Sequence, residues 1–290
     1  MWKLLQIELY KIFRRPRTYI AFGTIAALII ILQVGLKLDG QEYLDFMLNS
    51  LSKFDVSGTV LNGYMVCYVT LQMLLINVPL LVTLIAGDMI SGEANMGTLR
   101  FMLGKPYSRS QILIAKFLAA SIYTFLLLIW LAIFALLLNL VIFGTGDLMI
   151  FKSSYLVIIN HDDIFWRYMG AFCFAFLSMT TVAAVGFLLS IFAENSIGPI
   201  VGTMSVIIFF TVISTLNIPM YNVIKPFLFV THMNVWKEFF DQKADAHNVG
   251  IPGTLQNPQR IINSALVLLA HIVGLVSLAV YIFKKKDILS

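Results

Sequence analysis

Six stretches of this 290-residue chain contain no charged side chain and are rich in hydrocarbon; they are residues 18–36, 56–87, 117–146, 168–193, 195–224 and 261–283. A membrane-spanning helix needs about 20 apolar residues, because it rises 1.5 Å per residue across a hydrocarbon layer of about 30 Å. A charge at mid-bilayer costs at least about 2.5 kcal/mol on insertion scales. Membrane-spanning segments therefore avoid charged residues, which explains six charge-free stretches of this length. The pattern predicts spans at approximately 18–36, 65–87, 112–143, 168–192, 196–216 and 262–283.

We therefore expect residues 1–290 to form a single all-α polytopic membrane domain. Composition agrees, because 59% of the residues are hydrophobic and only 12% are charged, whereas soluble domains carry about 25% charged residues. The net charge of +5 does not point to nucleic acid, since the bases lie beside apolar runs and suit anionic lipid headgroups. Cys67 and Cys173 both fall in apolar runs and are interpreted as small buried hydrophobic residues.

The N-terminal segment "MWKLLQIELYKIFRR" predicts an amphipathic helix that ends before Pro16. Helical spacing puts one apolar face on Trp2, Leu5, Leu9 and Ile12, with the bases towards other faces, as in a helix lying in the headgroup region. A solvated basic tail is the alternative. The basic segment and the apolar run after it also resemble a signal peptide, but that run is long and no small-residue cleavage site follows, so we expect a retained first helix.

The distribution of basic residues predicts the orientation. With six spans, both termini share a side with the short connections after the second and fourth spans. Bases outnumber acids on that side, where they are Lys3, Lys11, Arg14, Arg15, Arg17, Arg100, Lys105, Arg109, Lys116, Lys284, Lys285 and Lys286. We expect both termini to be cytoplasmic and the protein to lie in the cell (plasma or inner) membrane.

The opposite side carries three loops of unequal length. Residues 37–55 and 147–167 are interpreted as polar connections. The third loop, 217–260, is broken by Pro219 and Pro226 and is expected to form short helices on the outer leaflet, or else an ordinary loop. Its rings suit a membrane interface; they are Phe227, Phe229, Trp236, Phe239 and Phe240.

Catalytic, nucleotide and metal motifs are missing from the sequence. The nearest approach to a phosphate loop, Gly97 to Gly104-Lys105, has six intervening residues where the Walker A pattern needs four, and Pro106 follows where Ser or Thr is needed. Paired-cysteine spacings and H-E-x-x-H are also missing, and His271 is the histidine within a span. We expect no catalytic residue, metal or cofactor on this chain.

Polar side chains within the spans include Gln72, Asn77, Thr180 and Thr181. Intramembrane polar groups face other helices or a cavity, so these four residues are candidates either for a substrate pathway or for helix–helix contacts. The sparse polar lining suits a lipid-like or amphipathic cargo better than a bare ion.

The connection after the second span, residues 88–111, contains charges, glycines and a proline between two apolar spans. The segment "EANMGTLRFML" is long enough for a helix of about three turns, with Glu93 at its N-terminal end, where the helix dipole favours an acid. Phe101 and its apolar neighbours exceed what a solvated linker needs. Ser108-x-x-Gln111 predicts a capping box that starts the next helix. A plain basic connector is the alternative.

The stretch "GDMISGEANMGTLRFMLGKPYSRSQILIAKFL" resembles the signature region of ABC-2 type permeases, the membrane subunits of ATP-driven exporters. The resemblance rests on an acid, a Gly-Thr-Leu group, a Pro-x-Ser-Arg group and a lysine in the family's order; here these are Glu93, Gly97, Thr98, Leu99, Pro106, Ser108, Arg109 and Lys116. The six spans, the N-terminal helix and the long loop before the last span fit the same family, so the resemblance covers nearly the whole chain.

The resemblance implies that this connection is a cytoplasmic coupling helix that docks on a separate ABC ATP-binding subunit, with Arg100 in the same interface. It also implies that two permease chains, identical or different, surround the pathway, and that ATP is bound and hydrolysed by the partner subunit. The connection "AENS" at 193–196 is very short, so we expect most coupling to pass through residues 88–109 and the N-terminal helix.

The resemblance makes an export permease the leading function. A polytopic membrane enzyme is one alternative, but it needs a cluster of ionisable groups at one depth in the bundle. A non-transporting ABC-type complex acting on envelope components is the other, and the sequence barely separates it from an exporter.

Overall fold

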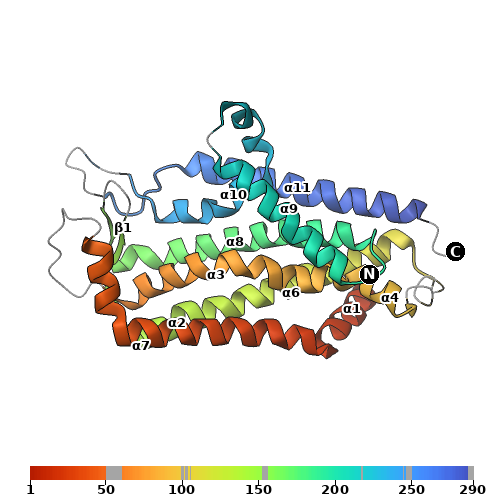
Figure 1. Ribbon diagram of the computed structural model, residues 1–290, viewed down its shortest axis with the longest axis horizontal. Coiled ribbons are helices and arrows are strands. Elements are labelled where there is room, and N and C mark those ends of the chain that lie inside the picture. Colours follow the sequence, from red (N-terminus) through yellow and green to blue (C-terminus); the bar gives the residue numbers. More distant parts are fainter. Residues whose placement is uncertain are drawn as a thin grey trace.

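The computed structural model describes residues 1–49, 61–98, 101, 104, 106–151, 156–216, 218–243, 245 and 250–286. Among these, six helices are long and apolar enough to cross a membrane, at Pro16–Gly40, Gly63–Ala86, Arg109–Phe143, His161–Ser190, Ile197–Thr215 and Pro258–Lys285. The predicted six-span, all-α class is therefore confirmed. The helices form an elongated bundle with both termini at one end (Figure 1). We call this the termini end, and the opposite end, where β1 lies, the hairpin end.

The first two spans are joined to short helices at the termini end. Helix α1 (Trp2–Arg14) precedes the kinked helix α2 (Pro16–Asn49), and α3 (Gly63–Ala86) is followed by α4 (Asp88–Asn95). Asn62 caps α3 by accepting a hydrogen bond from the backbone N–H of Met65 at 3.0 Å. The boundary between α3 and α4 is Gly87, whose backbone stays near the helical region, so the two helices nearly continue one another.

The third span contains three consecutive helical segments, α6 (Arg109–Ala132), the π-helix η1 (Ile133–Leu137) and α7 (Leu138–Phe143). The buried Gln33 of α2 donates a hydrogen bond from Nε2 to the carbonyl oxygen of Phe134 at 3.4 Å. Trp130 on the preceding turn donates from Nε1 to the carbonyl oxygen of Phe22 at 3.1 Å. The irregular turn is therefore fastened to the first span through polar contacts.

The connection at 147–167 contains a β-hairpin and the start of the fourth span, where a polar connection was expected. Strands β1 (Leu148–Phe151) and β2 (Leu156–Ile159) pair antiparallel, with Leu148 opposite Ile159. Alternate side chains, including Leu148, Ile150, Val157 and Ile159, are buried against the end of the bundle. The period-two alternation of a half-buried strand therefore applies here.

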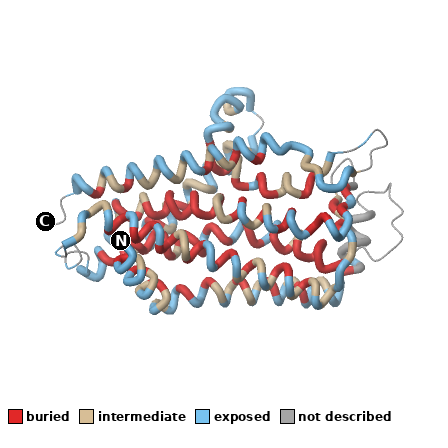
Figure 2. Tube along the Cα trace, turned by 180° about the vertical axis from the view of Figure 1, so that it is seen from behind, coloured by how far each residue is buried: buried red, intermediate tan, exposed pale blue. Residues whose placement is uncertain are grey.

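Helix α8 (His161–Ser190) lies at the centre of the bundle, in contact with α3, α6, α9 (Ile197–Thr215) and α11 (Pro258–Lys285). In its most apolar stretch 67% of the residues are buried, compared with 11% in α9 and 17% in α11. Figure 2 shows the same contrast, with buried positions concentrated on the inner helices and exposed ones along the outer helices. The outer spans therefore leave large apolar surfaces for lipid or for another protein.

The long loop after α9 folds into the expected short helices, η2 (Pro219–Val223), η3 (Lys225–Phe227), α10 (Phe229–Met233) and η4 (Asn234–Phe240). The prediction that its rings face the membrane interface is wrong for most of them. Trp236 and Phe240 are buried, and the Phe240 ring lies 4.8 Å from that of Tyr168 and 5.2 Å from that of Tyr68. These rings complete the core because α3 and α8 present aromatic partners to them. Among the five rings, that of Phe227 is well exposed, at 73%.

A buried ion pair fastens this loop to α8. Arg167 is fully buried and donates to Asp163 Oδ2 at 2.6 Å, to the carbonyl oxygen of Phe239 at 2.7 Å and to that of Thr254 at 2.8 Å. Asp163 Oδ2 also accepts from the backbone N–H of Gly253 at 3.1 Å. Arg167 therefore binds two carbonyl oxygens of the loop and neutralises Asp163, which itself accepts a hydrogen bond from the loop.

We predict that Arg167→Met lowers the free energy of unfolding by about 3–5 kcal/mol, because Asp163 loses its cation in a buried site. The matched control is Arg260→Met, which breaks an ion pair between Glu238 and an arginine that is 59% exposed and is expected to cost at most about 1 kcal/mol. Thermal unfolding of the two purified variants in detergent measures the difference. Equal losses would show that the Arg167 contacts contribute no more than a surface pair.

Candidate functional site at the termini end

Four segments that are distant in sequence meet at the termini end: α1, the start of α2, α4 and the start of α6. Helix α1 packs on α6 through Leu4, Glu8 and Ile12, which recur every fourth residue and are all buried. Trp2, on the apolar face that was predicted to lie in the headgroup region, is 68% exposed. The predicted helix exists, and the face that it buries in the protein includes Glu8, because Lys11 and Lys116 neutralise that acid.

The centre of this junction is a group of two acids and two bases, Glu8, Lys11, Glu93 and Lys116, which we call the Glu93 cluster; all but Lys11 are buried. The Nζ atom of Lys116 lies 2.8 Å from Glu8 Oε2 and 2.8 Å from Glu93 Oε1. Lys11 Nζ lies 2.8 Å from Glu93 Oε1 and 3.0 Å from Glu8 Oε1. Lys116 is 1% exposed and Glu93 is 4% exposed, so α1, α4 and α6 share one neutralised charge cluster.

Burial and charge act in opposite directions on this cluster. Burial alone would raise the pKa of Glu93, but the Lys116 charge and the hydrogen bonds from Lys11 and Lys116 lower it below the ordinary value of 4.5. Burial likewise disfavours the charged form of Lys11, yet its contacts with Glu93 and Glu8 raise the pKa of this amine above 10.5. Both residues are therefore charged at neutral pH.

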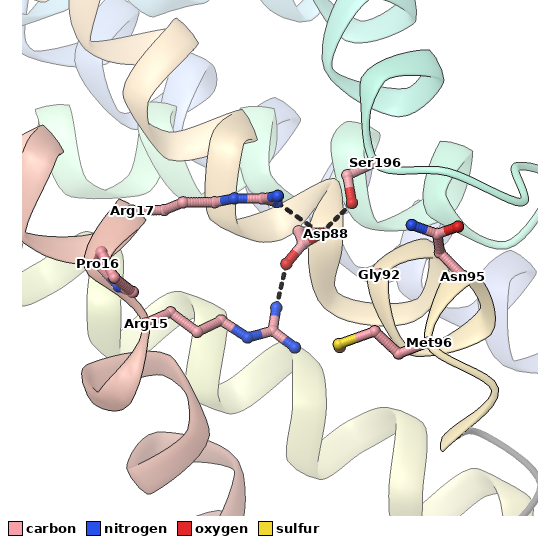
Figure 3. A pocket seen from close by; sticks show the side chains of 8 residues that line it. All are labelled: Arg15, Pro16, Arg17, Asp88, Gly92, Asn95, Met96 and Ser196. Atoms are coloured by element: carbon pink, nitrogen blue, oxygen red, sulfur yellow. Dashed lines mark hydrogen bonds and ion pairs between the residues drawn. The ribbon is translucent and has the colours of Figure 1, made fainter.

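A second acid, Asp88, joins the α1–α2 junction to α4 and α9 (Figure 3). Its carboxylate accepts hydrogen bonds from Arg15 and from Ser196 Oγ, and from Arg17 Nη1 at 3.2 Å. Gly92 lies directly against this side chain, and a Cβ at position 92 would overlap the Asp88 carboxylate. Because Asp88 is buried, the short 193–196 connection is held to the N-terminal segment through this one acid.

Helix α4 differs from the short helix that was expected over "EANMGTLRFML". It spans Asp88–Asn95 and passes through Gly92, so Glu93 lies near its C-terminal end and Asp88 occupies the first turn. Glycine is a poor helix-interior residue, but here it makes room for the Asp88 side chain. Ser190 of α8 accepts from the backbone N–H groups of Ile90 at 3.1 Å and Ser91 at 2.9 Å, so α4 packs into the bundle.

The connection beyond α4 is exposed where the structure describes it. Gly97 adopts φ +67°, a left-handed conformation that glycine tolerates and that ends the helix. Thr98 is exposed and donates from Oγ1 to the carbonyl oxygen of Glu93 at 3.3 Å. Phe101 is 82% exposed. The predicted interface residues Leu99 and Arg100 lie outside the described residues.

The start of α6 contains the predicted capping box. Ser108 Oγ accepts from the backbone N–H of Gln111, and the Gln111 side chain accepts from the backbone N–H of Ser108. Pro106 is exposed before it. Arg109 donates to the carbonyl oxygens of Lys284 at 3.2 Å and Lys286 at 2.9 Å, which are at the C-terminal end of α11.

These positions divide the sequence-predicted coupling residues into two groups. Glu93, Lys116 and Arg109 bind other parts of this chain, whereas Gly97, Thr98, Pro106 and Ser108 lie at the exposed connection. Sequence reasoning missed Glu8, Lys11, Asp88, Arg15 and Arg17 as partners within the junction. A signal for Glu8 was available, since it is the acid between Leu4 and Ile12 on one apolar helix face.

The four polar candidates within the spans also separate. Gln72 and Asn77 are exposed on α3. Thr180 and Thr181 are buried, and their hydroxyls donate to carbonyls one turn earlier on α8, at 2.7 and 3.0 Å. Within the described part of the chain, no group of three or more His, Cys, Asp or Glu side chains could hold a metal ion.

The model of a family described as "ABC-2 family transporter protein" matches residues 2–288. Over 117 residues the chain is also 32% identical to the Bacillus subtilis (strain 168) protein named "Uncharacterized protein YhcI"; this match covers 39% of the chain and 37% of that protein. The alignment therefore spans little more than a third of the relative.

The chain belongs to the ABC-2 family of transporter proteins. It is a multi-pass membrane component of an ABC transport system.

We predict that Glu93→Gln destabilises the protein by roughly 3 kcal/mol at neutral pH, the lower part of the range for breaking a buried pair, since Lys11 remains partly exposed. The control is Glu194→Gln, an exposed acid at the same end. Because the folded pKa of Glu93 is lowered, its carboxylate stabilises the fold above about pH 4.5 and that contribution is lost as pH falls through the folded value.

Melting temperatures recorded in detergent between pH 7 and pH 3.5 test both statements. The gap between wild type and Glu93→Gln is expected to narrow as the solution becomes more acidic, whereas Glu194→Gln follows wild type throughout. A gap that is independent of pH would contradict the role given to the Glu93 charge.

Proposed function

We propose that this chain is the permease subunit of an ABC-type export system, in which two permease chains surround the pathway and a separate subunit hydrolyses ATP. The family match supports the transport role. The observation that favours coupling at the termini end is the Glu93 cluster, because it links α4 to α1 and to the third span through buried ion pairs. The cell membrane and cytoplasmic termini belong to the same proposal and rest on the basic residues at this end.

The proposed docking surface is the exposed connection between α4 and α6, represented in the structure by Asn95, Met96, Gly97, Thr98 and Phe101. An exposed aromatic side chain is an effective anchor in a protein interface, because its burial on the partner removes a large apolar area from water. Glu93, Lys116 and Arg109 then act behind this surface. They hold the connection to the third and last spans, so that a displacement by the partner reaches the bundle.

We expect the tagged chain to purify with an ABC ATP-binding subunit, and Phe101→Asp to reduce recovery of that subunit several-fold. The matched control is Phe227→Asp, which introduces the same charge at a phenylalanine that is 73% exposed, in the loop beyond the far end of α9. Quantitative immunoblotting of both subunits after purification measures the ratio. Unchanged recovery with Phe101→Asp would remove this connection as the docking surface.

The exposed face of α3 is the proposed border of the pathway. Gln72 and Asn77 lie on this face with Met73, Ile76 and Leu80, all of them exposed. Polar amides facing lipid carry a desolvation cost, so their position favours contact with water or with a second permease chain. The few polar groups on this face suit an amphipathic cargo.

We predict that Asn77→Cys reacts with a water-soluble thiol reagent several-fold faster than Ile208→Cys. Ile208 is the control because it lies on α9 and is 60% exposed. Both variants are made after Cys67 and Cys173 are replaced by alanine, and rates are measured by mass spectrometry in lipid nanodiscs. Water reaches Asn77 if this face borders the pathway, whereas equal rates at the two sites would mean that α3 faces lipid here.

A further inference from the structure

An apolar groove runs between the third and fourth spans, away from the charged junction. Its volume is about 420 Å³, within the range of about 300–1,000 Å³ that is usual for ligand pockets. One wall is formed by residues 125–136 of α6 and η1, the other by residues 165–176 of α8. Both walls therefore belong to helices that are long and apolar enough to cross a membrane.

The π-helix η1 contributes Ile133 and Leu136 to the groove. A π-turn shifts the side chains that follow it around the helix axis, and such turns are frequent at functional sites. The large rings next to this turn point away, because Trp130 donates to the carbonyl oxygen of Phe22 and its ring lies 4.5 Å from that of Phe134. The small Ala132 remains on the groove side and leaves space there.

The groove offers a ligand hydrocarbon contacts and few polar ones. Tyr168 contributes a hydroxyl to the lining, but that group donates to the carbonyl oxygen of Tyr64 at 2.6 Å. Cys173 contributes a weakly polar thiol and is exposed, in contrast to the prediction that both cysteines are buried; Cys67 is the buried one. An apolar space of this kind disfavours water and can take an apolar ligand.

The groove lies in the half of α8 nearest the hairpin end and is open to its surroundings along both walls, since Phe125 and Ile133 on the α6 and η1 wall are 48% and 44% exposed. Phe165, in the second turn of α8, is 58% exposed, and Met169 one turn further is 53% exposed. A flexible chain whose headgroup lies at that membrane face reaches these residues first and continues towards Phe176. The groove therefore has the position, shape and chemistry of a site for one long hydrocarbon chain.

We propose that this groove binds one acyl chain of a bilayer lipid in the leaflet at the hairpin end. In this position the chain packs against Phe125 on one wall and against Phe165, Tyr168, Phe172 and Phe176 on the other. This site depends on α6 and α8 of the chain itself, so it holds a lipid irrespective of the exported substrate and of the ATP-binding partner.

The test uses the full-length protein in nanodiscs containing phosphatidylcholine with a photoreactive diazirine on one acyl chain. After illumination, peptide mass spectrometry is expected to find adducts in residues 125–136 and 165–176 several-fold more often than around Ile208 and Phe209 of α9. These two α9 residues are about as exposed as Phe165 and Met169 of the groove. Equal labelling of the two surfaces would mean ordinary boundary lipid and would overturn the proposal.

A filled groove gives the second arm of the test. Ala132→Phe places a ring in the space, and Cys173→Phe does so from the opposite wall; each is expected to reduce labelling of the groove several-fold and leave that of α9 unchanged. A second copy of the chain as the occupant would instead give little groove labelling and efficient Cys173–Cys173 crosslinking by a bifunctional maleimide, with Cys67 unreactive. That outcome, or unchanged labelling in both filled variants, would exclude the lipid site.

Discussion

The structure at the termini end depends on one ammonium group, that of Lys116, held between Glu8 and Glu93 with almost no exposure. A charge buried this deeply is tolerated only with its partners in place, because an unpaired ion in low dielectric costs several kcal/mol. The N-terminal helix, the short helix after the second span and the base of the third span therefore cannot separate one at a time. They behave as a unit through these ion pairs and through the packing of α1 on α6.

The hairpin end is stabilised differently. There a single arginine, Arg167, donates hydrogen bonds to carbonyl oxygens of the irregular loop, which has no regular backbone pairing to satisfy them. Rings from the same loop then complete a core around Tyr168, which stacks with Tyr64 and packs on Phe240. Helix α8 carries these contacts at one end and receives α4 through Ser190 at the other. Helix α8 therefore makes contacts that fix the structure at both ends of the molecule.

The hydrophobic pattern was sufficient to predict the spans, because the charge-free windows reflect the cost of burying ions in hydrocarbon, and Ser108 with Gln111 was enough to predict the start of α6. The features that could not be predicted from the sequence depend on contacts between residues that are distant along the chain. Gly92 lies inside α4 although glycine is a poor helix former, because it accommodates the Asp88 side chain. The hairpin at 148–159 was missed because each strand has only four residues, and the rings near Trp236 face inward because α3 and α8 provide aromatic neighbours.

The contact of Arg109 with the terminal carbonyls of α11 has a mechanical consequence. Arg109 is the first residue of α6, so the third and sixth spans are tethered at a common point beside the exposed connection. A force applied to that connection is thus divided between two helices that contact each other and α8, which favours a tilt of the bundle as a whole over a piston-like shift of one helix.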